Sequence, residues 1–168
     1  MPTVTETLCT RCGLCCDGTL FGDVELAGQR EAARLEALGM DVDADDADVE
    51  LLALPCAGLR GTRCSVYLHR PRCCRTFECR LLQEAQRGIV TEDDALARIA
   101  AARTKVQTVT RLLAGLEPRR GARLPLAERV ADALAAGPAR SAATARQRAA
   151  LVDARDALAR TIKTTFLD

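Results

Sequence analysis

The pattern of apolar positions divides the chain into two parts of different character. From residue 89 onward, Leu, Ala, Ile and Val recur at spacings of three and four, which is typical of amphipathic helices. Breaks at Gly115 and at Gly137-Pro138 separate the helical stretches. The pattern therefore predicts a helical hairpin or small bundle, with helices over residues 91–113, 125–136 and 141–164.

Polar residues mark the starts of two of these helices. Thr91-Glu-Asp-Asp94 is shaped like a capping box, although Asp stands at the fourth position in place of Glu or Gln. Ser141 is a suitable N-cap for the last helix. These signals support the predicted helix boundaries.

Shorter apolar runs fill the first part of the chain. Helical spacing over residues 26–38 ends at Gly39, and Pro71 suits the first turn of a helix that runs to about residue 87. Residues 41–50 read as an acidic turn. The remaining runs predict short strands over residues 19–24, 49–54 and 64–67. The last two of these are the predicted arms of a β-hairpin.

Composition agrees with a mainly helical fold. Hydrophobic residues make up 48% of the 168 residues and are mostly Ala and Leu, with three Phe, one Tyr and no Trp. This favours closely packed helices over a sandwich or barrel. We expect a mainly α fold with a small β-hairpin. Because every cysteine lies between Cys9 and Cys79, we expect a cysteine-cluster module (1–88) and a helical extension (89–168).

Charge is unevenly distributed along the chain. Residues 1–50 carry a net charge of −9, residues 51–100 carry +3, and residues 101–168 carry +7. The basic C-terminal helices could contact a protein partner, although a solvated Arg-rich surface explains the charge more simply. Aromatic residues do not interleave with the bases, so we do not expect a nucleic-acid partner.

Targeting signals are not expected in this sequence. The apolar runs are shorter than a bilayer span, which predicts that no membrane is involved. The N-terminal residues lack the basic and apolar regions of a secretory signal. We therefore expect a cytoplasmic protein, in which the reducing environment disfavours structural disulfides.

The cysteines form two clusters with metal-ligand character. The first is Cys-x2-Cys-x2-Cys-Cys over residues 9–16, and the second spans residues 56–79. Thiolates are soft donors that suit tetrahedral zinc or an iron–sulfur cluster. Nine grouped cysteines in a chain without a signal peptide indicate metal binding rather than disulfides.

The adjacent pair Cys15-Cys16 constrains the number of metal sites. Neighbouring side chains diverge, so these two thiolates do not easily ligate the same tetrahedral ion. The sequence therefore favours two four-thiolate sites or one polynuclear site, with one cysteine spare. Six arginines interleave with the second cluster and are candidate counter-charges, or ordinary surface residues: Arg60, Arg63, Arg70, Arg72, Arg75 and Arg80.

Several other metal motifs fail on spacing. The bacterial ferredoxin run and the motif of radical enzymes that use S-adenosylmethionine both require cysteine where this chain has Thr19. A finger with paired histidines is excluded because His69 is the only histidine. We interpret His69 as a surface or packing residue rather than a metal ligand. The acidic turn lacks the Gly and Glu of a calcium loop. No catalytic residue is indicated, so the sequence leaves open whether the protein is an enzyme.

The two clusters, together with Cys64-Ser-Val-Tyr67 and Arg70-Pro71, resemble the CxxCxxCC family of YkgJ-like cysteine cluster proteins. The resemblance covers about residues 8–82 and implies zinc or iron chelation, with Cys73 as the spare thiol. A related cluster occurs in flagellin lysine N-methylases, which keeps an iron–sulfur or multi-iron redox centre as the alternative. The implied metal ligands are Cys9, Cys12, Cys15, Cys16, Cys56, Cys64, Cys74 and Cys79.

Overall fold

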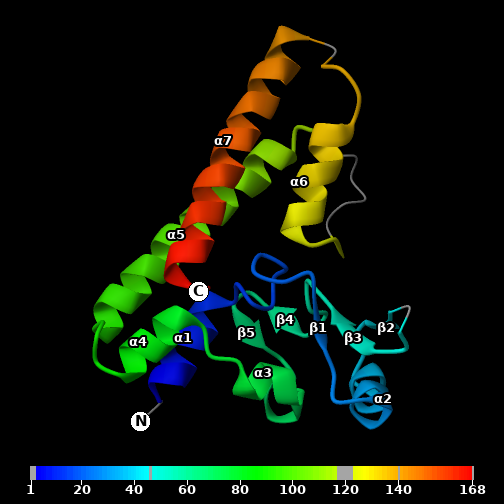
Figure 1. Ribbon diagram of the computed structural model, residues 1–168, viewed down its shortest axis with the longest axis vertical. Helices are drawn as coiled ribbons and strands as arrows, with labels where there is room; N and C mark the ends of the chain where they lie inside the picture. The colour runs from blue at the N-terminus through cyan, green and yellow to red at the C-terminus, as the bar shows by residue number, and fades with distance from the viewer. Residues whose placement is uncertain (1–2, 46, 117–122, 140, 168) are drawn as a thin grey trace.

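Two long helices, α5 (Glu92–Leu113) and α7 (Ala142–Thr165), lie side by side as an arm that rises from the cysteine-rich part of the chain (Figure 1). The structure is a computed structural model that describes residues 3–45, 47–116, 123–139 and 141–167. The shorter α6 (Leu126–Ala135) packs against both helices. The three helices predicted from the apolar period are therefore confirmed.

Capping and apolar packing explain this arm. The hydroxyl of Thr91 accepts the N–H of Asp94 at 3.1 Å, and that of Ser141 accepts the N–H of Thr144 at 3.1 Å. In the usual capping box, the longer Glu or Gln side chain accepts the backbone N–H of the N-cap residue. The shorter Asp94 side chain instead accepts a hydrogen bond from the Thr91 hydroxyl. Burying each large side chain contributes about 1.5–3 kcal/mol. The core of the arm consists of Val109, Leu113, Leu126, Val130, Ala133, Leu151 and Leu158.

The N-terminal helix α1 (Val4–Cys12) was not predicted. Thr3 and Glu6 form a complete capping box at its start, and Gly13 ends it in the left-handed conformation with φ of 71°. Leu8 is its buried residue, so the apolar period is too weak to reveal a helix of this length. α1 nevertheless matters, because it carries the first two cysteines.

A three-stranded antiparallel sheet follows in the order β1-β3-β2, with α2 (Gln29–Ala37) packed against it. Its strands are β1 (Asp23–Glu25), β2 (Val42–Ala44) and β3 (Glu50–Ala53). The strand predicted over 49–54 is confirmed. The strand predicted over 19–24 lies later, and the helix predicted from residue 26 begins at 29, because Leu26 still donates to Glu50 in the sheet. The predicted acidic turn contains β2, whose residues pair with β3.

The second strand pair differs from the predicted hairpin. β4 (Leu59–Arg60) and β5 (Arg63–Cys64) pair through a two-residue turn, in which Gly61 has a φ of 62°. The segment from 64 to 67 was expected to return against 49–54, but β3 already pairs with β1 and β2 on its two sides. Tyr67–His69 form a turn of 3-10 helix, η1.

The helix predicted over 71–87 is two helices, α3 (Arg72–Thr76) and α4 (Arg80–Gln86). Phe77 and Cys79 adopt extended backbone angles between them. Phe77 packs edge-on against Phe21 at 5.2 Å between ring centroids, and the N–H of Arg80 donates to the carbonyl of Phe166. These partners lie far away in the chain, so the local pattern could not reveal the break.

One core cluster joins the N-terminal cysteine region to the arm. Its buried residues come from α1 and the following turn, α4, the turn between α4 and α5, α5 and the C-terminal end: Leu8, Leu14, Leu81, Leu82, Val90, Ala95, Ile99, Ala102 and Phe166. Apolar packing therefore continues across residue 88, where we predicted a boundary between two segments. Among the described residues, no helix is long and apolar enough to cross a membrane.

Candidate metal centre

All nine cysteines line one cavity of about 400 Å³. Each is a free thiol; Cys9 is exposed at the rim and the others are half-buried. They come from α1, the turn after it, the segment after β3, β5, α3 and the start of α4. The fold therefore brings together the eight predicted ligands and Cys73, although up to 70 residues separate them in the chain.

The first four cysteines follow a helix that ends in a sharp turn. Cys9 and Cys12 lie one turn apart on α1. The N–H groups of Cys16 and Asp17 both donate to the carbonyl of Gly13 at 3.0 Å, which closes the turn. A Cβ at Gly13 would approach the Thr62 Cα to 3.2 Å. Glycine therefore permits the close contact between this turn and the β4–β5 hairpin.

Hydrogen bonds connect the second cluster to the first. The N–H of Cys56 donates to the carbonyl of Cys16 at 2.8 Å, and the hydroxyl of Thr62 donates to the carbonyl of Thr10 at 2.6 Å. The N–H of Gly58 points at the sulfur of Cys56 at 3.4 Å. Such donors favour a thiolate and are typical of the surroundings of metal-bound sulfur.

Glu31 on α2 positions the helix that carries Cys73 and Cys74. One carboxylate oxygen accepts the N–H of Arg72 at 2.9 Å, and the other accepts the N–H of Ala27 at 2.9 Å. Only 9% of Glu31 is exposed, so both bonds form with little competition from water. The sequence gives no sign of this role, because the partners of Glu31 are backbone groups, which leave no signature in the sequence.

Burial favours the protonated form of several of the thiols. Burial, followed by neighbouring thiols, raises the pKa of Cys12 and of Cys16 to about 12. Burial likewise raises the pKa of Cys15. A hydrogen bond with Cys74 lowers the pKa of Cys73 to about 7 and raises the pKa of Cys74. A cation that replaced these protons would relieve the repulsion among the thiolates.

Of the six candidate arginines, Arg70 lines the cavity. Its guanidinium lies 3.6 Å from the centre of the Tyr67 ring, a cation–π contact that holds it beside the thiols. Arg60 donates to the carbonyls of Ala57 and Leu59, and Arg80 pairs with Glu84 at 2.9 Å. His69 is exposed, so of the two roles expected for it, surface or packing, the structure shows the surface one.

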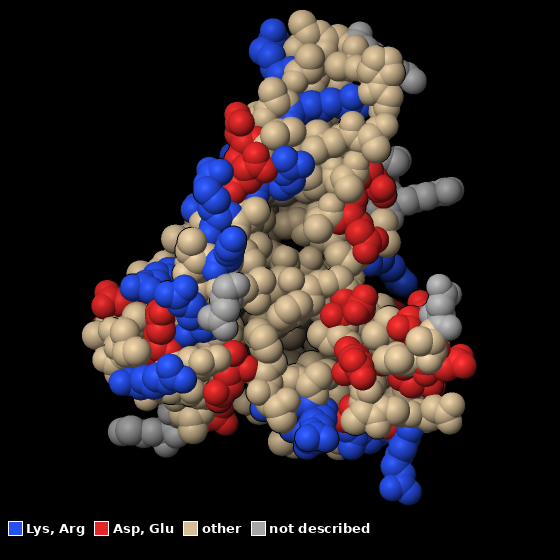
Figure 2. Space-filling model, viewed as in Figure 1, with Lys and Arg blue, Asp and Glu red and all other residues tan. Residues whose placement is uncertain are grey.

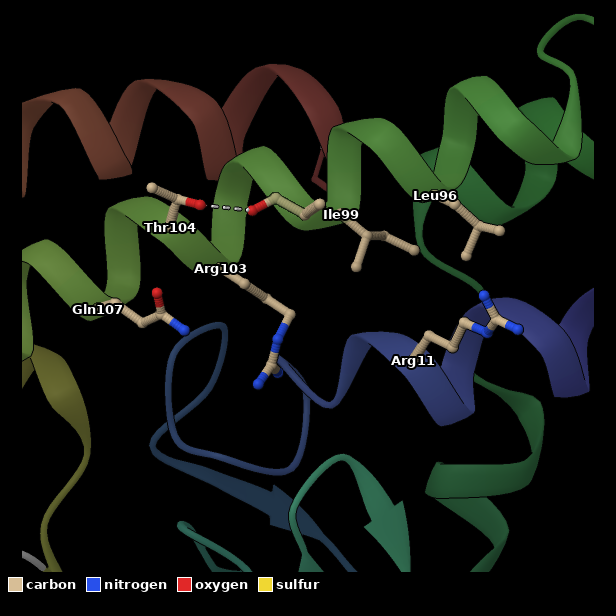
Figure 3. Close-up of a pocket in the computed structure, with 7 residues that line it drawn as sticks. Arg11, Leu96, Ile99, Arg103, Thr104 and Gln107 are labelled. Atoms are coloured by element: carbon tan, nitrogen blue, oxygen red, sulfur yellow. Dashed lines mark hydrogen bonds between the residues drawn. The ribbon is translucent and has the colours of Figure 1, made fainter.

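A shallower hollow of about 350 Å³ lies between α1 and α5, next to the cysteines (Figure 3). Arg103 reaches from α5 toward the end of α1, where it donates to the carbonyl of Cys12 at 2.7 Å (Figure 3). Arg11 and Gln107 also line this hollow. Arg103 is thus a second residue that supports the site and that the sequence analysis did not identify.

The donor set fits zinc or iron by its chemistry, since sulfur-only sites are typical of both. Within the part of the chain that the structure describes, no three His, Cys, Asp or Glu side chains stand close enough to form a ready-made metal site. The cysteines are gathered around a cavity rather than closed into a ligand shell. They supply more thiols than one tetrahedral ion uses.

A comparison with protein families matched residues 8–105 to the family "CxxCxxCC: Putative zinc- or iron-chelating domain". Neither the comparison with curated proteins nor that with solved structures found a match. The matched region covers more than half of the chain and contains every cysteine. It also extends into α5, the helix that carries Arg103. The chain therefore belongs to the CxxCxxCC family.

Proposed function

We propose that the protein binds zinc or iron through thiolates of its two cysteine clusters. One observation carries this proposal: cysteines from six separate segments line a single cavity. Packing apolar residues alone would not require sulfur at each of these positions. The proposed ligands are Cys9, Cys12, Cys15, Cys16, Cys56, Cys64, Cys74 and Cys79.

If the metal is zinc bound by four thiolates, the site is closed and its role is structural. Metal binding then supplies free energy of folding to a region whose sheets are very small. In that case we expect the arm to offer the functional surface. Figure 2 shows basic side chains along the arm, with acidic ones among them, and mainly acidic side chains over the sheet. The basic stretches of the arm would suit an acidic protein partner.

An iron–sulfur or multi-iron redox centre is the second candidate. The cavity of about 400 Å³, lined by more thiols than one tetrahedral ion uses, leaves room for a polynuclear centre. Arg70 and Tyr67 at the cavity wall would then contribute to the polarity around the centre. We infer no reaction for such a centre.

Anaerobic purification, elemental analysis and a visible absorption spectrum test the function. Zinc or iron should copurify in stoichiometric amount and should fall sharply in Cys12→Ala and Cys64→Ala variants. A colourless zinc protein would refute the redox candidate, and sulfide-to-iron charge-transfer bands would refute the plain zinc site. Unchanged metal content in folded variants would refute the ligand assignment.

A further inference from the structure

The hollow between α1 and α5 belongs to a different surface from the cavity of the cysteines. Its volume is about 350 Å³, and none of the cysteines, all of which the structure describes, lines it. Of the described residues that line the hollow, only Ile99 also lines the cavity. The hollow therefore contains side chains that the proposed metal site does not use.

One side of α5 forms the floor of the hollow. Its lining residues recur at spacings of three and four along the chain, which places them on the same side of the helix. They are Leu96, Ile99, Ala100, Arg103, Thr104 and Gln107. Ile99 is buried and Leu96 is half-buried. The floor is therefore apolar near Leu96 and polar toward Gln107 (Figure 3).

Two arginines, one from each helix, supply the charge of the hollow. Arg11 lies in the last turn of α1, and Arg103 lies on α5. Within the described ranges, no Asp or Glu lines the hollow, and the side chain of Arg11 has no hydrogen-bond or ion-pair partner. The charge of Arg103 also acts on Asp17, which lies outside the hollow. The hollow is therefore a positively charged surface with an apolar floor.

Arg103 is already held in place from one edge. Its Nη1 donates to the carbonyl of Cys12 at 2.7 Å, whereas Nη2 and Nε have no partner among the residues that the structure describes. A guanidinium that is fixed in this way can donate to a carboxylate with little further loss of side-chain entropy. The amide of Gln107, one turn further along α5, adds another donor on the same side of the helix.

The shape of the hollow favours a protein segment over a free small molecule. Pockets for small ligands enclose most of the ligand surface. Here Arg11, Ala100, Thr104 and Gln107 are all exposed, so a small molecule would keep much of its surface in water. Protein interfaces, in contrast, combine arginine anchors with an apolar centre and a polar rim. The charge of the two arginines requires an acidic partner.

We propose that the hollow between α1 and α5 docks an acidic, amphipathic segment of a protein partner, with its carboxylates paired to Arg11 and Arg103 and an apolar side chain over Leu96 and Ile99. This inference deepens the proposed function, in which the arm contacts an acidic partner, and it holds for either metal. Because Arg103 also holds the carbonyl of Cys12, the docked segment lies next to the backbone that carries the first cysteines.

Two synthetic peptides test the docking site on the full chain. The acidic peptide has about 16 residues, with Leu and Glu along one helical face and Ala and Gln elsewhere, and the neutral peptide carries Gln in place of each Glu. We expect fluorescence anisotropy to show about tenfold tighter binding of the acidic peptide. Equal affinities or no binding would overturn the proposal. Tighter binding of single-stranded DNA, or full displacement of the peptide by equimolar glutarate, would also overturn it.

Substitutions then locate the binding of the acidic peptide. Arg11→Glu should weaken it about tenfold, because a like charge replaces the partner of the carboxylate. Arg111→Glu is the matched control, since Arg111 is exposed on α5 outside the hollow. Ala100→Trp should fill the hollow and block binding, whereas Ala97→Trp, at an exposed position of α5 outside it, should not. Equal losses within either pair, in variants that remain folded by circular dichroism, would show that the peptide docks elsewhere.

Elemental analysis of the same samples separates this inference from the proposed function. Lost peptide binding with native zinc or iron content would be expected of Arg11→Glu. A native protein that binds the acidic peptide but holds neither metal would refute the metal site and leave the docking surface standing. A native protein that holds metal but does not bind the peptide would refute the docking surface alone.

Discussion

Arg103 of α5 donates a hydrogen bond to the carbonyl oxygen of Cys12, the last residue of α1, across 2.7 Å. This carbonyl belongs to the helix end that turns into Cys15-Cys16. The arm is therefore attached directly to the backbone that positions the first cysteines.

Replacing Arg103 should loosen this attachment. We expect Arg103→Met to lower the free energy of unfolding by about 1–3 kcal/mol, because it removes a charge-assisted bond to a half-buried carbonyl. Zinc affinity should fall together with stability. Chemical denaturation and competition with a chelator measure the two effects. Arg98→Met is the control, since Arg98 is half-exposed on the same helix and pairs with Glu84 only at 3.5 Å; equal losses in both variants would contradict the expectation.

Replacing Glu31 tests how α3 is positioned. Both carboxylate oxygens of Glu31 accept backbone N–H groups. In Glu31→Gln the amide nitrogen cannot accept, so its N–H donors would face one of these two backbone N–H groups. We expect a loss of about 1–3 kcal/mol in unfolding free energy and weaker metal binding by the cysteines on and near α3. The exposed Glu36 of the same helix supplies the control, Glu36→Gln. A Glu31→Gln protein with native stability and native metal affinity would show that this carboxylate does not hold α3.

The turn at Gly13 offers a closely matched pair of glycines. Gly13 and Gly88 have φ values of 71° and 72°, but a Cβ at Gly13 meets the Thr62 backbone at 3.2 Å while one at Gly88 meets nothing within 4 Å. Both alanine variants should lose about 1–2 kcal/mol to backbone strain. Gly13→Ala should lose more and should also weaken metal binding. Equal metal affinity in the two variants would show that the contact with Thr62 does not shape the site.

The metal-free protein should lose stability in alkali. The folded state raises the pKa of Cys12 and of Cys16 from the ordinary value of 9.0 to about 12. The unfolded chain therefore ionises first, and the stability present below pH 9 is lost as the pH rises toward 12. Denaturation midpoints measured across this range test the expectation. Zinc-loaded protein is the control, because its thiols are already deprotonated; a flat profile without metal would contradict the raised pKa values.

The sequence predicted the helices of the arm well because their signals are local. Thr91, Ser141 and the break at Gly137 lie at or next to the ends of the helices that they mark. The division of the helix between Phe77 and Cys79 depends on Phe21 and Phe166, and no local pattern carries that information. β2 was hidden for a related reason, since an edge strand rich in Asp resembles a turn until its partner is known.

For the site, spacing predicted that the cysteines gather, and the cavity they line agrees with it. The residues that support the cysteines could not be predicted from the sequence. Glu31 acts on a backbone group 41 positions away and Arg103 on one 91 positions away. Backbone groups are the same at every residue, so such contacts leave no compositional trace.

The place of Phe166 in the core has a consequence for the order of events during synthesis. Its side chain is 2% exposed among Leu8, Leu14 and Leu81, and its carbonyl accepts the N–H of Arg80. The ribosome makes every cysteine long before it makes this residue. Because Phe166 also lines the cavity of the cysteines, that part of the cavity wall can form only after the end of α7 has been translated.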